Sequence, residues 1–191
     1  MTSPRLILAA LIAATAVAAA QSQPDSSGPR PAKPDLPESP AQTKAKLAKS
    51  QATASALESA INQFFLEYAA LPDVGDHVET NTAKGTKMLE ILLGIEGDSD
   101  KAQNARAIKF LTVKETKTKT NGLLYDSSGK SVVGLYDFWG NPFSVVLDWT
   151  YEERLRFSLG SKRLTLNGRR CAIYSPGADK KLGTDDDVKT W

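Results

Sequence analysis

The chain has 191 residues, a formal charge of +2 and a hydrophobic fraction of 41%, which predicts one folded domain with a modest core and additional segments. A net charge this small argues against the strongly basic surface with which proteins bind DNA or RNA. The single cysteine, Cys171, excludes an internal disulfide, and its apolar sequence neighbours favour a small core side chain.

The first twenty residues are typical of an export signal. Arg5 supplies a basic start, residues 6–20 carry no charge, and residues 18–20 are the alanines of a small-residue cleavage site. The apolar run is shorter than the roughly 20 residues that span a bilayer. We therefore expect residues 1–20 to be removed and the protein to be periplasmic or secreted. An uncleaved membrane anchor is the alternative.

Residues 21–42 have the composition of a linker. Six prolines occur between positions 21 and 40, among Ser, Gly, Asp and Glu residues. Such a segment buries too little apolar surface to offset the entropy lost on ordering. It should be extended, and the folded body is expected to comprise residues 43–191.

Helical patterns dominate the first part of this body. Residues 43–70 contain neither Gly nor Pro, and their large apolar residues recur at three- and four-residue steps until Pro72 stops the helix. Residues 86–93 predict a second, short helix with Gly94 as its C-cap. The apolar positions of the first helix, together with the residue that follows it, are Leu57, Ile61, Phe64, Tyr68 and Leu71.

Strand patterns follow. Residues 143–148 give the strongest strand prediction, because they are rich in β-branched and aromatic side chains. In residues 155–159, apolar and polar side chains alternate with period two. Asn167-Gly168 separates two further runs and predicts a hairpin turn. The predicted fold class is α+β, with a long amphipathic helix packed on a small antiparallel sheet. Shorter candidates are residues 122–125 and 132–136, and residues 108–113 are either a strand or a docked extended segment.

Carboxylates and glycines crowd the C-terminus. Asp179 and the run Asp185–Asp187 are interspersed with Gly177 and Gly183, and an aromatic residue, Trp191, ends the sequence. Ca²⁺ takes six to eight oxygen ligands, so a bound calcium ion would relieve the repulsion among these acids. Glycines suit the tight turns of a loop that folds back. A solvated acidic tail is the alternative reading.

Three segments in this order resemble the major pseudopilin of type II secretion systems, general secretion pathway protein G. They are the helix end Phe64–Pro72, the stretch Tyr136–Phe143 with its Trp-Gly-Asn-Pro step, and the ending Tyr174–Trp191. Within the second, Asp137 is expected to hold the turn by a side-chain to backbone hydrogen bond. The resemblance implies a pilin-like head, no enzymatic activity, and one calcium ion bound in the C-terminal loop.

The resemblance also implies a ligand set. Lys180 departs from the family pattern, in which Gly commonly follows the first aspartate, and Lys180 and Lys181 should weaken calcium binding through their positive charge. The implied ligands are the carboxylates of Asp179, Asp186 and Asp187, with the Ser175 hydroxyl, the Leu182 carbonyl and Asp185 as additional candidates.

The N-terminus departs further from that family. An export signal and a Pro-rich linker stand where pseudopilins carry a prepilin cleavage motif and a hydrophobic stem. We therefore expect a structural or accessory component of a secretion or pilus-like apparatus, with protein partners, and with membrane contact only if the leader stays attached. A free-standing binding module that reuses the fold is the alternative. A hydrolase is a weaker alternative, because the only histidine, His77, is predicted to lie in a polar loop, and no nucleophile motif accompanies it.

Overall fold

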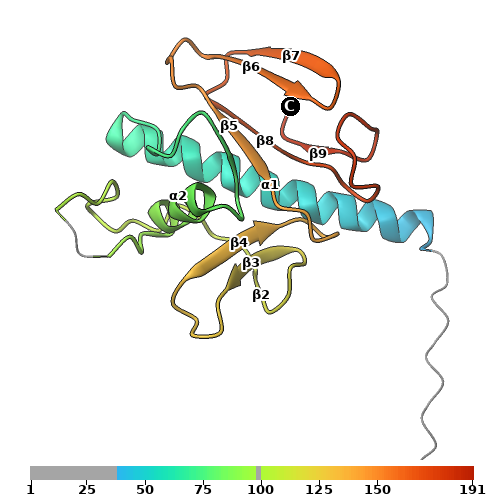
Figure 1. The fold of residues 1–191 in the computed structure, drawn as a ribbon, viewed down its shortest axis with the longest axis horizontal. Coiled ribbons are helices and arrows are strands. Elements are labelled where there is room, and N and C mark those ends of the chain that lie inside the picture. The colour runs from blue at the N-terminus through green and yellow to red at the C-terminus, as the bar shows by residue number, and fades with distance from the viewer. Residues whose placement is uncertain (1–37, 98–99) are drawn as a thin grey trace, which may run out of the picture. The chain divides into compact units, whose positions relative to one another are not determined.

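The computed structural model describes residues 38–97 and 100–191. The predicted export signal and most of the predicted linker lie outside these residues. The fold is mixed α+β with one long helix, as predicted (Figure 1). Its elements are α1 (Pro40–Tyr68), β1 (His77–Glu79), α2 (Ala83–Leu93), β2 (Glu115–Thr116), β3 (Gly122–Tyr125), β4 (Val132–Tyr136), β5 (Ser144–Leu147), β6 (Arg154–Leu159), β7 (Lys162–Asn167), β8 (Cys171–Ser175) and β9 (Val188–Lys189).

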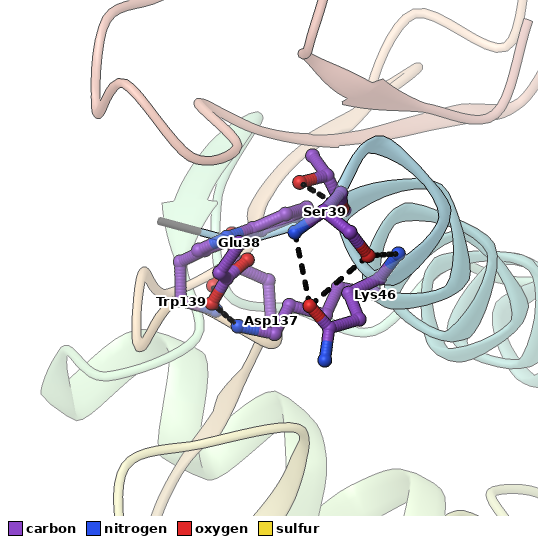
Figure 2. A network of polar contacts seen from close by, with 7 residues as sticks. Glu38, Ser39, Lys46, Asp137 and Trp139 are labelled. Carbon is purple, nitrogen blue, oxygen red and sulfur yellow. Dashed lines mark hydrogen bonds and ion pairs between the residues drawn. The ribbon is translucent and has the colours of Figure 1, made fainter. Parts of the chain in front are cut away.

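Helix α1 begins three residues before the predicted start because Ser39 and Gln42 form a capping box. The Gln42 amide donates to Ser39 Oγ at 3.3 Å, and the Ser39 amide donates to Gln42 Oε1 at 2.9 Å (Figure 2). An ion pair with Lys46 ties Glu38, the residue before the N-cap, to the next part of the helix. The helix ends at Tyr68, followed by Ala69 in a left-handed conformation. Its apolar face is buried as predicted through Leu57, Ile61 and Phe64.

Helix α2 starts at Ala83, earlier than predicted, because the Thr82 side chain accepts a hydrogen bond from the Gly85 amide. It ends at Gly94 in the left-handed region, as predicted. Of the two predictions for residues 108–113, a strand or a docked extended segment, the second is confirmed. The amides of Phe110 and Leu111 both donate to the Leu92 carbonyl at 2.9 Å.

The described strands form three sheets. A four-stranded antiparallel sheet has the order β1-β5-β8-β9, and α1 lies against β8 and β9 (Figure 1). A three-stranded sheet, β2-β3-β4, contains one parallel pair, and α2 packs against β4. The third sheet is the hairpin β6-β7.

Both faces of the four-stranded sheet are covered. Because side chains alternate along a strand, Val145 of β5 and Ile173 of β8 join the main core beneath α1. Val146, Ala172 and Tyr174 point the other way and pack with the inner face of the β6-β7 hairpin. Helix, sheet and hairpin therefore form three layers.

The predicted hairpin at Asn167-Gly168 is wrong. Gly168 has the positive φ of 70° that favours glycine in a turn, but its amide donates to the Glu153 carbonyl, and the chain then enters a different sheet. Strand β8 pairs with β5, and the actual hairpin turns between β6 and β7 at Gly160 and Ser161. The Asn-Gly pair marks a turn, but long-range pairing decides which strands it joins.

Candidate metal-binding loop

The C-terminal loop, residues 176–187, is fastened to the body at both ends. Strands β8 and β9 flank it and pair antiparallel, with Ser175 opposite Val188. From α1, Gln51 Nε2 donates to the Lys189 carbonyl at 2.6 Å. The terminus therefore folds back onto the domain, as the glycine spacing predicted.

The final residue belongs to an aromatic cluster on the outer face of the four-stranded sheet. The Trp191 ring lies edge-on to Phe157 at 5.4 Å and to Tyr174 at 6.1 Å between ring centroids. Phe157 and Tyr174 are stacked at 5.6 Å. Such ring contacts add free energy beyond the burial of apolar area, so the chain end is packed and the alternative of a solvated tail fails for Trp191.

Asp186 organises the loop from within. Its Oδ2 accepts hydrogen bonds from the amides of Ala178 at 2.6 Å and Asp179 at 2.9 Å, and its Oδ1 accepts from Thr184 Oγ1 at 2.6 Å. Burial alone would raise the pKa of Asp186, but the hydrogen bonds from Thr184 and the two amides outweigh it and hold the pKa below its ordinary value. Asp186 is thus ionised and already engaged by the loop itself.

Asp187 differs from its neighbour because one of its oxygens has no partner. Oδ2 accepts from the Gly183 amide at 2.9 Å, whereas Oδ1 is buried and makes no hydrogen bond with any described residue. The residue is only 4% exposed, and burial raises the pKa of its carboxyl. A buried carboxylate oxygen without a donor is unfavourable unless a cation compensates it. This oxygen therefore fits a metal ligand.

The other candidate aspartates do not converge on that oxygen in the structure. Asp179 and Asp185 are exposed, and Asp179 Oδ1 accepts from the Lys181 amide at 2.8 Å. In the part of the chain that the structure describes, no three His, Cys, Asp or Glu side chains group so that they could hold a metal ion. Among the described residues, the loop thus presents one buried carboxylate oxygen without a partner, Asp187 Oδ1, while Asp179 and Asp185 of the same loop are exposed.

The two non-carboxylate candidates face other groups. The Ser175 hydroxyl donates to Asp137 Oδ2 at 2.9 Å. The Leu182 carbonyl oxygen lies against Gly160 in the hairpin turn, so closely that a Cβ at Gly160 would meet it at 2.4 Å. Both residues therefore help to attach the loop to the domain.

Asp137 is the centre of the contact between the loop and the body. Its Oδ1 accepts from the amides of Trp139 and Asn141, each at 2.8 Å, as the predicted turn requires (Figure 2 shows the Trp139 bond). Its Oδ2 accepts from Ser175 and from Asn141 Nδ2, which also donates to the Gly177 carbonyl at 2.7 Å. Sequence reasoning missed this link to the loop, because the partners lie 36 to 38 positions apart.

Cys171 and His77 are of residue types that often act as a nucleophile or a base in enzymes. Cys171 is buried in β8, and desolvation raises the pKa of its thiol to about 12, which keeps it protonated. His77 lies exposed on strand β1, not in a loop, and its Nε2 is 3.2 Å from the Tyr174 hydroxyl.

Comparisons with protein-family models, with curated proteins and with solved structures found no match to this chain. Among the described residues, no helix has the length and apolarity needed to cross a bilayer.

Proposed function

We propose that the protein is an exported, non-enzymatic, pseudopilin-like head that binds one calcium ion in its C-terminal loop. It would serve as a structural or accessory component of a type II secretion or pilus-like apparatus. The arrangement that supports this is a long helix on an antiparallel sheet with an acidic loop folded back onto it. The observation that carries the calcium site is the buried, unpartnered Asp187 Oδ1.

Asp187 would hold the ion as the central ligand, because its free oxygen is fixed by the Gly183 hydrogen bond on the other oxygen. Calcium accepts carbonyl, hydroxyl and water oxygens beside carboxylates, so a group of three acids is not required. The exposed carboxylates of Asp179 and Asp185 lie in the same loop and supply further negative charge. Bound calcium would neutralise that charge and hold the loop closed.

Calcium is expected to raise the melting temperature. A cation that binds only the folded state adds about 2.7 kcal/mol at a hundredfold excess over Kd, and extracellular sites have Kd values of roughly 10⁻⁴ to 10⁻³ M. Calcium at about 10 mM should therefore add about 1–3 kcal/mol, which is roughly 2–12 °C for a domain of this size. Differential scanning fluorimetry in calcium and in EDTA measures the shift. Equal melting temperatures would remove calcium from the proposal.

Asp187→Asn gives the sharper comparison, because calcium should reverse which of the two proteins, wild type or variant, has the higher melting temperature. Without calcium, the variant lacks the buried, partnerless charge and should melt at or above wild type. With calcium, wild type should melt higher, because only it retains the ionised oxygen. Asp73→Asn, an exposed site away from the loop, serves as the control and should respond to calcium like wild type. A calcium response that survives in Asp187→Asn would place the ion elsewhere.

The calcium effect should also depend on pH. Burial holds the pKa of Asp187 in the folded protein above its ordinary value of 3.8. Without metal, ionisation of Asp187 therefore lowers the free energy of unfolding as pH rises from the ordinary pKa through the folded pKa. Calcium requires the ionised form, and its stabilisation must grow over the same interval. The melting-temperature difference with and without calcium should be largest near neutral pH and shrink towards about pH 4. A difference independent of pH would contradict this assignment.

The proposed role in a secretion or pilus-like apparatus is tested by searching for binding partners. Cross-linking and pull-down with the pseudopilins and inner-membrane components of a type II secretion system should recover specific complexes. Recovery of none of these components would favour a free-standing binding module built on the same fold.

A further inference from the structure

Positive charge is concentrated in one part of the chain. Residues 154–170 contain five of the eight arginines and one lysine, and no Asp or Glu. Elsewhere lysine is the predominant cation, since the whole chain has 16 lysines. Arginine in preference to lysine favours forked, bidentate contacts with phosphate or carboxylate oxygens. This segment is the β6-β7 hairpin and the turn that follows it.

The register of the hairpin separates its side chains onto two faces. Arg154 pairs with Asn167, Arg156 with Thr165, and Ser158 with Arg163. All six of these residues are exposed, whereas the alternate positions pack inward against the sheet through Leu155, Phe157, Leu159, Leu164 and Leu166. The outer face is therefore polar throughout, and its three charges are all positive. The arginine face is defined here as Arg154, Arg156 and Arg163.

In the part of the chain that the structure describes, no side chain pairs with the guanidinium group of any of these three arginines. The other two arginines of the segment are paired: Arg169 with Glu58 and Arg170 with Glu153. Across residues 38–97 and 100–191, the arginine face makes no hydrogen bond or ion pair. Adjacent same-face positions on a strand are about 7 Å apart, so three guanidinium groups project from one small area, and no described carboxylate forms an ion pair with them.

Exposed apolar side chains border the same end of the hairpin. Leu66 of α1 is 78% exposed and lines a shallow hollow together with Asn167, the cross-strand partner of Arg154. Trp149 and Tyr151, 37% and 50% exposed, lie in the loop that enters β6. Only one other large apolar side chain among the described residues, Ile95, is similarly exposed.

We propose that the arginine face docks the protein on a membrane surface rich in anionic phospholipid. Arginine forks match headgroup phosphates, and aromatic side chains favour the interfacial region next to them. The outer face has no apolar centre of the kind that stable protein interfaces bury, which favours a layer of headgroups over a protein partner. In Figure 1 the hairpin lies at the upper edge of the domain, away from α2 and the three-stranded sheet, so a planar surface can approach it. This docking uses neither the N-terminal segment nor the calcium loop.

The test measures binding of residues 21–191, the form expected after leader removal, to large vesicles by sedimentation in calcium-free buffer. Vesicles contain phosphatidylcholine alone or with about 30% phosphatidylglycerol. The variant is Arg154→Gln, Arg156→Gln and Arg163→Gln together. The matched control, Lys84→Gln with Lys87→Gln and Lys109→Gln, removes the same charge from exposed positions elsewhere. Melting temperatures verify that all three proteins are folded.

Wild type and the lysine control should bind the anionic vesicles and leave the neutral ones unbound. Each arginine near a charged surface contributes about fivefold in binding, so the arginine variant should bind the anionic vesicles about a hundredfold more weakly. Added salt should weaken wild-type binding by screening. Equal binding to both vesicle types, or equal loss in both triple variants, overturns the proposal. Binding to polyglutamate without binding to vesicles also overturns it and assigns the face to an acidic protein.

Discussion

Asp137→Ala is expected to lower the free energy of unfolding by about 3–5 kcal/mol. The Asp137 carboxylate is fully buried and accepts four hydrogen bonds, from two amides of its own turn, from Asn141 Nδ2 and from Ser175 Oγ. Alanine leaves these donors buried without acceptors, at about 1–3 kcal/mol for each that finds no other partner. Relief of the buried charge offsets part of that sum. Urea unfolding followed by circular dichroism measures the change.

Asp126→Ala is the matched control. Asp126 also holds a turn, accepting from Ser128 Oγ and from the amides of Lys130 and Ser131, but it lies near the surface, where water replaces lost partners. The same substitution should therefore have a much smaller effect. Similar losses at the two positions would show that the buried network around Asp137 adds little to local turn formation.

Gly177→Ala is expected to destabilise the protein by about 2–4 kcal/mol and to abolish its response to calcium. Gly177 has φ of 68°, and a Cβ there would lie 2.1 Å from the Asp186 carbonyl oxygen and 2.9 Å from its Oδ2. Strain in the left-handed region costs about 1–2 kcal/mol, and displacing the backbone adds to it. Because Asp186 precedes the proposed ligand Asp187, the displacement should disturb the calcium site as well. Melting curves with and without calcium measure both effects.

Gly168→Ala separates strain from steric contact. Gly168 has a closely similar φ of 70°, but nothing lies within 4 Å of the position its Cβ would take. It should lose only the backbone strain, about 1–2 kcal/mol, and should retain the calcium response. If both glycine variants lost the same stability, the close approach of the Asp186 carbonyl would have no energetic consequence.

Local patterns were enough to predict the helices and several strands. The apolar spacing from Leu57 to Phe64 predicts the buried face of α1, since helical periodicity is a property of neighbouring residues. The bounds of β3 and β4 also agree with their predicted segments. The pattern predicts the start of α1 three residues too late, because the capping box of Ser39 and Gln42 lies within the Pro-rich stretch.

The candidate site was only partly predictable. The acids and glycines of the loop and its aromatic end indicated a terminus that folds back, and β9 pairing and the Trp191 contacts confirm it. That Asp186 is occupied by backbone amides while Asp187 keeps a free oxygen does not follow from two adjacent, identical side chains. Their difference arises from the direction in which the folded loop points each carboxylate.

Elements with local causes follow from the order of the residues alone: the periodic helices, the alternating strands and the turn at Asp137. How these elements pair and pack follows from long-range contacts. Strand β8 pairs with β5 across the Asn167-Gly168 turn, because the two alternating faces of β8 fill both apolar clusters. Packing of the hairpin also directs Arg154, Arg156 and Arg163 outward. Side chains alternate along a strand, so burial of the leucines on one face places the arginines on the opposite, exposed face.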